Sequence, residues 1–432
     1  MVDVDLTIKF CGVELRNPIA AASHAPAGPF THKVICPDIY LKLIRKYYIL
    51  GLGALVTGTI TSYSGNLNWR GTNFFLPISV PGFAEKEGFV SAAKIPDVGF
   101  PKPIGIRVVE RCKKEFKDMA IIASIAGPGG NIEGWLSLVK EVASAGADML
   151  ELNFGGPETF ESVEKALKVL ETRRNLFEIG GIILGLIPEL AAEIVKFIVR
   201  SVNIPVIVKI TPELGFFRVI QAARLYKDAG AKGLTCSHSF ITVAPPDIYN
   251  KGKSTLPTIE GYPLSSFWAT VGPWTRFAAY RDTAAVCKYV HNIDVFTCGG
   301  LVIPEHCIEA MMLGAKGVQL SAGIFWNGIS FIRKVIDFMR KFLTEQGYCS
   351  VKEIVGLGLK DLVELGEVKF PKRIAKINYD KCVNCYICLD TWCFALEERN
   401  GKVFVNEELC RGCNLCVIRC PEKAIYLQYL ES

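Results

Sequence analysis

Four cysteines recur at fixed intervals in Cys410-Arg-Gly-Cys-Asn-Leu-Cys-Val-Ile-Arg-Cys-Pro421. Three thiolates separated by two residues each bind three iron corners of one [4Fe–4S] cubane, and a fourth Cys followed by Pro reaches a second cluster. A partner run precedes this one in the 432-residue sequence, with cysteines at positions 382, 385, 388 and 393. The two runs predict two clusters, the first held by Cys382, Cys385, Cys388 and Cys420 and the second by Cys410, Cys413, Cys416 and Cys393.

The partner run departs from the regular spacing at its end. One extra residue precedes Cys393, and Phe394 stands where Pro is usual, so Cys393 is the least regular ligand. Zinc is an alternative, because Cys-x2-Cys pairs also bind it, and a disulfide framework is another. The two triplets and the Cys-Pro favour iron–sulfur over both. We therefore expect residues 371–432 to form a small α+β domain of the bacterial ferredoxin type with two [4Fe–4S] clusters.

Upstream, short apolar runs alternate with helical stretches such as Trp135–Ala145 and Pro188–Val199. Near-continuous apolar runs are typical of parallel strands buried on both faces. The expected strands are Ile19–Ala22, Ala54–Thr57, Ile121–Ile125, Met149–Asn153, Val206–Ile210, Gly233–Cys236, Val295–Thr297 and Gly317–Leu320. Eight such units predict an α/β fold, a (β/α)8 TIM barrel over residues 1–330. A doubly wound open sheet is the rival, and the lack of a Gly-x-Gly-x-x-Gly after the first strand disfavours it.

The segments around the expected barrel have their own predictions. An opening hairpin, Leu6–Phe10 and Val13–Leu15, is expected to plug the bottom of the barrel. Two long connections, 62–100 and 238–273, are expected at its active face. Residues 331–370 are predicted to be a helical linker of two stretches joined by Tyr348-Cys349-Ser350.

Small or polar residues follow the expected strands, where a TIM barrel places its chemistry. They are Ser23, Thr59, Ser124, Asn153, Lys209, Ser237-His238, Gly299-Gly300 and Ser321-Ala322-Gly323. Such a set suits a flat cofactor at the barrel mouth, and the last two Gly-containing turns suit a phosphate. Gly299-Gly300 alone is equally well explained as a plain turn. Lys209 and Asn153 at neighbouring strand ends favour the cofactor.

Several stretches of the chain resemble the dihydroorotate/dihydropyrimidine dehydrogenase family. They are Leu6–Pro18, Ile122–Ile125, Ala145–Asp148, Glu151–Phe154, Lys209–Pro212 and Gly299-Gly300. The overall architecture is most similar to the iron–sulfur FMN subunits of bacterial NAD-dependent dihydropyrimidine dehydrogenases, over nearly the whole chain. The resemblance implies FMN, with Ala22 and Ser23 against the ring, Ser124, Asn153 and Lys209 at its polar edge and ribityl chain, and Gly299, Gly300, Ala322 and Gly323 at the phosphate.

The substrate side departs from that family. Where the family reads Asn-x-Ser-Cys-Pro, this chain reads Asn153-Phe-Gly-Gly-Pro157, so Gly156 stands in the catalytic position and cannot carry a proton. Gly58 stands where a Lys near the flavin is usual, and His238-Ser239 where Asn-Thr faces a pyrimidine. The candidate replacement acids are His24, Glu158 and His238. We choose His238 because it directly follows the sixth strand and because imidazole ordinarily titrates near neutral pH.

Apolar residues dominate the loops expected at the barrel mouth. They are Phe74–Pro77, Gly180–Leu186, Phe267-Trp268 and Pro273-Trp274. They indicate either a substrate larger or more apolar than uracil or orotate, or the surface for a partner subunit. The expected function is an FMN- and iron–sulfur-dependent oxidoreductase for a CH–CH or C=C bond (EC 1.3 type). It would exchange electrons with an FAD/NAD(P)H-binding subunit or a ferredoxin, in a hetero-oligomer. A true dihydropyrimidine or dihydroorotate dehydrogenase and a non-catalytic electron-transfer subunit remain as alternatives.

The composition excludes other classes. The formal net charge of +6 is spread over the chain without a Lys/Arg block, which argues against nucleic acid. The first residues lack a signal-peptide pattern. The most apolar run, Gly180–Val199, contains charged residues and is too polar for a membrane span. We therefore expect a cytoplasmic protein.

Overall fold

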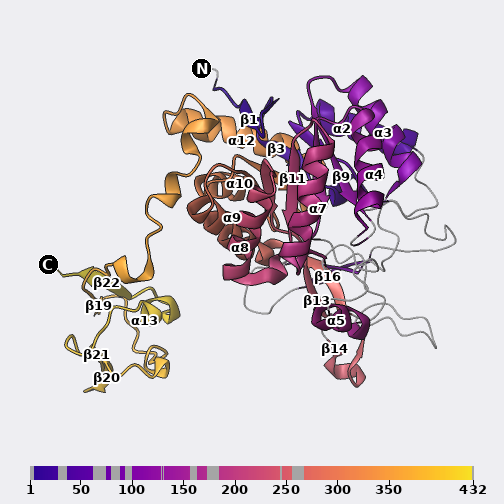
Figure 1. Cartoon of the computed structure of the whole chain (residues 1–432). Coiled ribbons are helices and arrows are strands. Elements are labelled where there is room, and N and C mark those ends of the chain that lie inside the picture. The colour runs from indigo at the N-terminus through magenta and orange to yellow at the C-terminus, as the bar shows by residue number, and fades with distance from the viewer. Residues whose placement is uncertain are drawn as a thin grey trace. The chain divides into compact units, whose positions relative to one another are not determined.

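The computed structural model describes residues 4–27, 37–61, 74–78, 88–92, 100–127, 129, 131–155, 163–172, 184–243, 246–254 and 267–430. The chain divides into two compact units, Met1–Asp361 and Leu362–Ser432 (Figure 1). Each unit is described by itself. The domain boundaries expected at residues 330 and 370 remain predictions.

The first unit is a closed barrel of parallel strands. Its strands are β3 (Ile19–Ala21), β4 (Ala54–Val56), β9 (Ala120–Ala126), β10 (Met149–Asn153), β11 (Val206–Ile210), β12 (Gly233–Cys236), β17 (Asp294–Cys298) and β18 (Gly317–Leu320). They pair in this order around the barrel, with β18 pairing back to β3, and the β9–β10 pair excludes an open sheet. The TIM barrel is confirmed, and its strands are those that the apolar runs predicted. Every residue of β10 and β11 is buried, as parallel strands covered on both faces require.

The first unit also contains helices, most of which surround the strands. They are α1 (His24–Ala27), α2 (Pro37–Ile49), α3 (Lys102–Glu115), α4 (Ile132–Ser144), α5 (Val163–Thr172), α7 (Pro188–Ser201), α8 (Gly215–Asp228), α9 (Arg276–Tyr289), α10 (Pro304–Met312) and α11 (Ala322–Asn327). The Asn131 side chain caps α4 by accepting a hydrogen bond from Gly134 N at 3.1 Å. Pro188 is the first residue of α7. A backbone N–H at this position would have no hydrogen-bond partner within the helix, so the lack of an N–H in proline costs no hydrogen bond. None of the helices within the described ranges is long and apolar enough to cross a membrane.

A hairpin closes the amino-terminal end of the barrel. It consists of β1 (Ile8–Phe10) and β2 (Val13–Leu15), joined by a turn at Cys11-Gly12 in which both residues have positive φ. Phe10 stacks on Phe296 with ring centroids 3.9 Å apart. Cys11 N donates to Asp294 Oδ2, at the start of β17, at 2.7 Å. These contacts agree with the expected plug.

The two long connections meet in a second sheet. It is antiparallel, in the order β13 (Phe240–Val243), β16 (Phe267–Val271), β7 (Gly88–Ala92) and β6 (Phe74–Ile78). Two further short strands, β14 (Pro246–Asp247) and β15 (Lys253–Ser254), pair with each other within the second connection. The short strands β5 (Ile60–Thr61) and β8 (Phe100–Pro101) instead extend the barrel sheet beside β9. Figure 1 shows β13 and β16 at the end of the barrel opposite β1, which is the end where the chemistry was expected.

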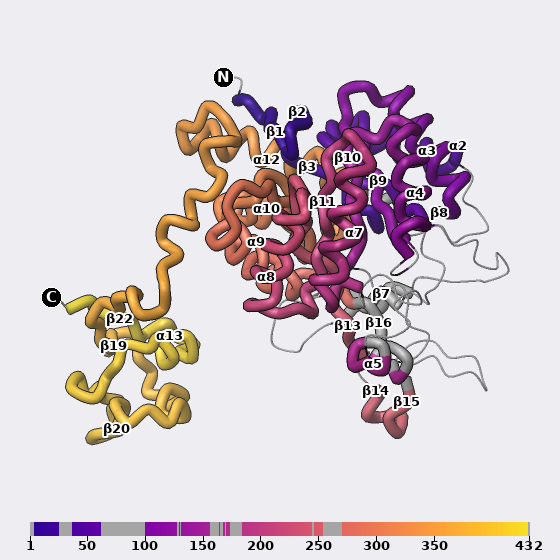
Figure 2. The backbone as a smooth tube through the Cα atoms, viewed as in Figure 1, coloured from indigo at the N-terminus to yellow at the C-terminus, as the bar shows by residue number. Residues whose placement is uncertain are grey.

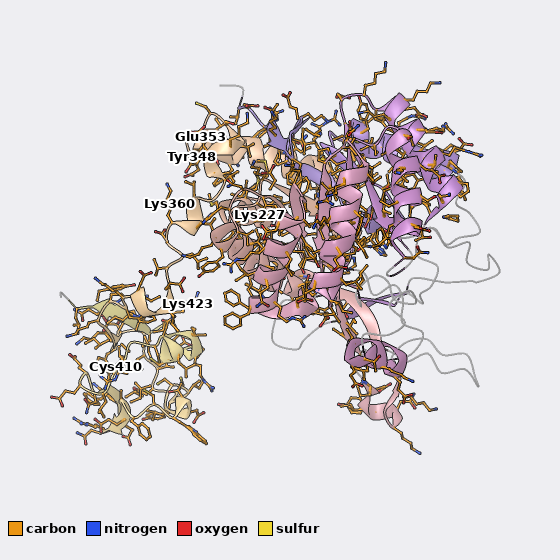
Figure 3. The ribbon with its side chains drawn as sticks, viewed as in Figure 1. Lys227, Tyr348, Glu353, Lys360, Cys410 and Lys423 are labelled. Carbon is orange, nitrogen blue, oxygen red and sulfur yellow. The ribbon has the colours of Figure 1, made fainter. Side chains whose placement is uncertain are left out.

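The segment after the barrel begins with α12 (Phe331–Glu345), whose apolar face joins the barrel core. The second predicted helix is wrong. In its place are three 3₁₀ turns, η6 (Val351–Ile354), η7 (Leu357–Leu359) and η8 (Leu365–Glu367). Gly347 and Gly356 have positive φ, which interrupts helical backbone. Glu353 accepts hydrogen bonds from Cys349 N and Ser350 N beside Tyr348 (Figure 3). This segment lies beside the first residues of the chain, because Asp5 and Ser350 form a β-bridge (Figure 2).

The second unit contains two antiparallel strand pairs and one short helix. The strands are β19 (Arg373–Ile377) with β22 (Ile425–Tyr429), and β20 (Leu396–Arg399) with β21 (Lys402–Val405). The helix is α13 (Leu415–Arg419), and a 3₁₀ turn, η9, covers Leu389–Thr391. Its small core includes two of the predicted cluster ligands, Cys388 and Cys416. Burial of cysteines in so small a core suits a domain built around inorganic clusters.

Candidate functional site

Polar side chains from neighbouring strands meet inside the carboxyl-terminal half of the barrel. In the parallel pairing, Asn153 of β10 lies beside Lys209 of β11, which in turn lies beside Thr235 of β12. Glu151 lies one pleat below Asn153, and its side chain therefore points to the same face. Burial of these four residues is nearly complete. The barrel thus places a buried cation and a buried carboxylate beneath its mouth.

Lys209 is held by a compact hydrogen-bond network. Its Nζ donates to Gln319 Oε1 at 3.1 Å and lies 3.7 Å from Glu151 Oε1, close enough for an ion pair but too far for a hydrogen bond. Glu151 Oε2 accepts hydrogen bonds from Gln319 Nε2 at 2.5 Å and from Thr235 Oγ1 at 2.7 Å. Burial alone would lower the pKa of Lys209, but the Cys298 thiol and the Glu151 carboxylate outweigh it and raise that pKa, so the ammonium stays charged.

A second polar group lies nearer the mouth. Asn153 Nδ2 donates to Thr59 Oγ1 at 3.3 Å, and Thr59 Oγ1 shares a hydrogen bond with Ser124 Oγ at 3.0 Å. Gly155 N donates to Asn153 Oδ1 at 3.3 Å. These bonds connect the ends of three consecutive barrel segments. The predicted flavin-edge residues Ser124, Asn153 and Lys209 are therefore brought to one side of the mouth.

The predicted phosphate residues also lie together. Gly299 and Gly300 both have positive φ, and a Cβ on Gly300 would come within 2.5 Å of Arg276 N. A Cβ on Gly323 would come within 2.4 Å of Leu301 O, so the start of α11 packs against the chain that follows Gly300. Only glycine allows these two turns to approach so closely.

The remaining predicted ring contacts join the same end of the barrel. Ala22 N donates to Leu320 O at 2.9 Å, immediately before the turn that contains Ala322. Both Ala22 and Ser23 are buried. The next residue, His24, packs edge-on against Phe325 of α11, with ring centroids 5.4 Å apart. The segment after β3 is therefore fixed beside the predicted phosphate turn.

His238 lies against the backbone of the altered family motif. A Cβ on Gly155 would come within 3.0 Å of His238 Cβ, and the imidazole Nδ1 shares a hydrogen bond with Ser239 Oγ at 2.8 Å. Burial, followed by the positive charges of Lys209 and His24, lowers the pKa of His238 well below its ordinary value. The expectation that this imidazole titrates near neutral pH is therefore wrong. It is a neutral group at pH 7.

Besides Glu151 Oε1, two buried polar atoms near the mouth have no hydrogen-bond partner within the described residues. They are His24 Nε2 and Arg276 Nε. Burial, and then the charge of Lys209, lowers the pKa of His24 to about 4, so this imidazole is also neutral at pH 7. Because unpaired buried polar groups are costly, such atoms indicate a polar ligand or bound water at the mouth.

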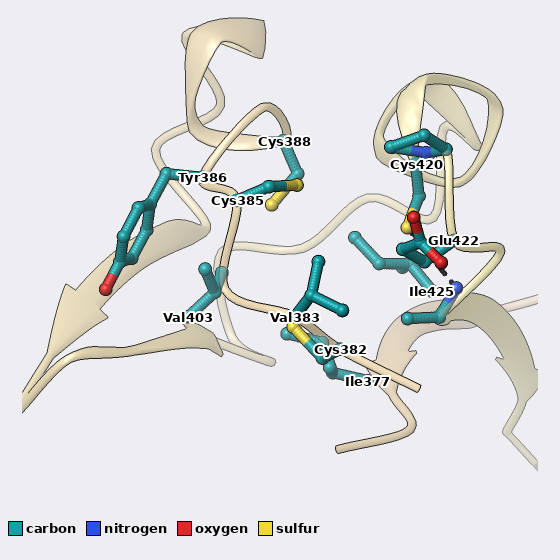
Figure 4. A pocket seen from close by; sticks show the side chains of 12 residues that line it. Ile377, Cys382, Val383, Cys385, Tyr386, Cys388, Val403, Cys420, Glu422 and Ile425 are labelled. Atoms are coloured by element: carbon teal, nitrogen blue, oxygen red, sulfur yellow. Dashed lines mark hydrogen bonds between the residues drawn. The ribbon is translucent and has the colours of Figure 1, made fainter. Parts of the chain in front are cut away.

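The cysteines of the second unit gather in the two sets that the spacing predicted. Cys382, Cys385, Cys388 and Cys420 line one cavity (Figure 4). Cys393, Cys410, Cys413 and Cys416 line another. Each set therefore combines three thiols from one run with one from the other, and the irregular Cys393 lies with its predicted partners. Cys410, labelled in Figure 3, marks the second set.

Zinc and an iron–sulfur cluster place different demands on these thiols. No three Cys, His, Asp or Glu side chains among the residues that the structure describes converge to hold a single metal ion. A zinc ion would draw its four ligands to about 2.3 Å from one centre. Thiols that surround a cavity instead suit a cluster of several atoms, whose irons stand between the sulfurs and the centre.

Comparison with known proteins identifies the barrel. A sequence model of the family described as dihydroorotate dehydrogenase matches residues 5–343, and one described as a 4Fe-4S binding domain matches residues 403–426. The chain belongs to the dihydroorotate dehydrogenase family. This family binds FMN, and the 4Fe-4S domain binds an iron–sulfur cluster. The chain is thus a flavoprotein-family oxidoreductase with a ferredoxin-type domain.

Named relatives span most of the chain at modest identity. The NAD-dependent dihydropyrimidine dehydrogenase subunit PreA of Escherichia coli K12 is 27% identical over 397 residues, which are 90% of this chain and 85% of that protein. The dihydroorotate dehydrogenase B (NAD(+)) catalytic subunit of Pyrococcus abyssi is 26% identical over 355 residues, 82% of this chain and 99% of that protein. The corresponding subunit of Methanocaldococcus jannaschii is 25% identical over 362 residues.

The Phe100 ring packs against Gly58, which stands where the resembled family usually has a Lys. A Cβ on Gly58 would meet the Phe100 ring at 2.7 Å, and Gly58 N donates to Tyr40 Oη at 3.2 Å. A Lys at this position would displace that ring. Gly156, Glu158 and residues 180–183 of the apolar loops expected at the mouth lie outside the described residues. Of the expected apolar loops, Trp274 is partly exposed and packs on Phe240, with centroids 5.2 Å apart.

For three residues of the hydrogen-bond network around Lys209, the sequence predicted no role in the site. Glu151, Thr235 and Gln319 are buried in strands that read as continuous apolar or small segments. Side chains two positions apart on a strand point to the same face, so the position of Glu151, two residues before Asn153, could have indicated that both face the barrel interior. Only the stagger of the closed barrel shows that Gln319 lies beside Glu151.

Proposed function

We propose that this chain is an FMN- and iron–sulfur-dependent oxidoreductase that acts on a CH–CH or C=C bond of a substrate other than a pyrimidine. The observation that carries the proposal is the contact between His238 and Gly155. It puts an ionisable group beside the motif in which the resembled enzymes keep their proton-transferring Cys or Ser. The chain therefore keeps a proton carrier while it loses the groups that a pyrimidine would use.

The residues at the barrel mouth fit FMN. Lys209, Asn153 and Ser124 would hold the polar edge and ribityl chain, Ala22 and Ser23 would lie against the ring, and Gly299, Gly300, Ala322 and Gly323 would hold the phosphate. The unpartnered His24 Nε2 and Arg276 Nε support a polar occupant at this end. When bound, FMN supplies hydride transfer and the conversion between one- and two-electron chemistry.

His238 is proposed as the proton carrier. Because Nδ1 is engaged by Ser239, Nε2 is the nitrogen left to exchange a proton with the substrate. The lowered pKa keeps this nitrogen unprotonated at pH 7, which suits a general base that removes a proton from a CH–CH substrate. In the reduction of a C=C bond, protonated His238 would be a strong acid, but only a small fraction of the protein would carry it at pH 7.

The two thiol sets are proposed to hold two [4Fe–4S] clusters that connect the flavin to another protein. The 4Fe-4S domain match covers the second cysteine run alone, and the first cavity supports the second cluster. At the rim of the other cavity, Trp392 is 90% exposed and Phe394 is 94% exposed. Aromatic residues so exposed favour a protein contact beside a cluster. The partner would be an FAD/NAD(P)H-binding subunit or a ferredoxin.

The names of the relatives favour a second candidate, a true dihydropyrimidine or dihydroorotate dehydrogenase. One experiment separates the candidates: anaerobically purified chain, with its cofactor content measured, is assayed with an artificial electron acceptor or donor. The substrates are uracil, thymine and dihydroorotate, and larger enoyl and aromatic compounds. Turnover confined to the larger compounds is expected. Turnover of a pyrimidine at ordinary enzyme rates overturns the proposal, and transfer of electrons without any substrate turnover indicates an electron-transfer subunit.

A further inference from the structure

Only one of the two oxygens of the buried Glu151 carboxylate accepts hydrogen bonds. Its Oε2 accepts hydrogen bonds from Thr235 and Gln319, whereas Oε1 has no hydrogen-bond partner among the described residues. The side chain is fully buried, and a buried carboxylate is costly unless a cation compensates it. Its ion-pair partner is Lys209, 3.7 Å away.

Lys209 is shared between Glu151 and the mouth of the barrel. Its ammonium donates to Gln319 Oε1, and the same Gln319 amide donates to Glu151 Oε2. Gln319 therefore bonds both charged groups, which lie 3.7 Å apart. Because Lys209 bonds Gln319 and is beyond hydrogen-bond distance of Glu151, part of its charge is available to a group above it.

We propose that Glu151 is a positioning residue that sets how much of the Lys209 positive charge reaches the flavin ring. The inference rests on the proposed FMN site. Charges a few ångströms apart interact strongly in a buried site, because water screens them poorly there. Lys209 stabilises an anionic reduced flavin, and the Glu151 carboxylate offsets that effect. The Glu151–Lys209 pair thus tunes the flavin reduction potential, with Thr235 and Gln319 fixing its geometry.

The sign of each substitution follows from the charges. Glu151→Gln keeps the shape of the side chain and leaves Lys209 uncompensated, so the reduced anionic flavin binds more tightly relative to the oxidised form. Glu151→Asp keeps the charge but withdraws the carboxylate from Lys209, which gives a smaller shift in the same direction. Lys209→Met removes the cation and shifts the potential the opposite way.

The test is an equilibrium titration of flavin potential in the full chain reconstituted with FMN. For Glu151→Gln we expect at least a tenfold rise in the ratio of affinities for reduced and oxidised flavin, which is about 30 mV for a two-electron couple. We also expect the reduced flavin to stay anionic to lower pH than in wild type. Asp282→Asn is the matched control, because Asp282 is a buried acid on α9 outside the barrel interior, and its potential is expected to equal that of wild type.

The outcomes separate this inference from the proposed function. A wild-type chain that binds no FMN contradicts the proposed function itself. A wild-type chain that binds FMN, together with a Glu151→Gln variant of unchanged potential and unchanged flavin pH behaviour, overturns the role of Glu151. If Glu151→Gln does not fold, Glu151→Asp decides, and a potential equal to or below that of wild type overturns the inference.

Discussion

His238 occupies the space that a side chain on Gly155 would need. A Cβ built on Gly155 would come within 3.0 Å of His238 Cβ and within 3.2 Å of His238 Cδ2. The loss of a side chain in the loop after β10 and the gain of an imidazole after β12 are thus two parts of one packing arrangement. Under the proposed function, the proton carrier lies on a different barrel segment from that of the resembled enzymes.

His238→Gln is expected to lower turnover of the true substrate by about 10²–10⁴-fold, which is the usual contribution of a positioned acid or base. FMN and iron content should not change, because His238 is not among the predicted flavin or cluster ligands. Steady-state kinetics with cofactor analysis measure both quantities. Undiminished turnover would show that another group carries the proton.

Gly155→Ala tests the packing directly. The added methyl must shift His238 by a few tenths of an ångström, and such a misplacement of the proposed proton carrier is expected to lower turnover by up to about 10-fold. Gly366→Ala is the control, because nothing lies within 4 Å of a Cβ at Gly366. A Gly155→Ala variant as active as the control would mean that the position of His238 does not matter.

The pH dependence follows from the direction of the His238 pKa. Burial, and then the charges of Lys209 and His24, lowers that pKa well below 6.5, so the neutral base predominates throughout the neutral range. Dehydrogenation should therefore be independent of pH around neutrality and should decline only in clearly acidic solution. The reverse reduction should gain rate as pH falls. A pH profile of dehydrogenation with an inflection near pH 6.5 to 7 would contradict this, as would an acid limb that persists in His238→Gln.

The number of clusters is tested by removing one ligand from the first set. Wild-type chain purified anaerobically is expected to hold about eight irons, and Cys385→Ser about four, because the other set keeps its thiols. Cys349→Ser is the control, since Cys349 is exposed and belongs to neither cavity. Zinc in place of iron, or iron content in Cys385→Ser equal to that of the control, would rule out the two-cluster assignment.

The barrel strands could be predicted because each is a short apolar run with no competing pattern. β10 and β11 have the predicted bounds, and β17 extends its prediction by one residue at each end. The helix predicted after Tyr348 failed because glycines with positive φ outweigh an apolar pattern. The contact of His238 with Gly155 could not be predicted, since it depends on how two loops leave neighbouring parts of a closed barrel.

Gly300→Ala tests the predicted phosphate turn. Gly300 has φ +69°, and a Cβ there would come within 2.5 Å of Arg276 N, so the substitution strains the backbone and opens the turn. Gly328→Ala is the control, because Gly328 has φ +77° but open space around its Cβ. Both variants place a side chain at positive φ, which costs on the order of 1–3 kcal/mol at each position. Only Gly300→Ala is expected to weaken FMN binding, measured by flavin fluorescence. Equal FMN affinity in the two variants would place the phosphate elsewhere.

Uracil, thymine and dihydroorotate are expected to be poor substrates, and Gly156→Cys is expected not to make them good ones. Restoring the thiol returns a proton carrier to the family position, but the hydrogen-bonding groups for a pyrimidine would still be missing. His238-Ser239 stand where the resembled enzymes present Asn-Thr, and Phe100 packs where they place a Lys. A hydride acceptor or donor without these contacts would bind in no fixed orientation, and orientation accounts for much of the rate of such a transfer. Turnover of the same panel by wild type, Gly156→Cys and His238→Gln measures each contribution. If Gly156→Cys alone raises uracil turnover to ordinary enzyme rates, the pocket differs from that of a pyrimidine enzyme by one thiol, and the proposed change of substrate is wrong.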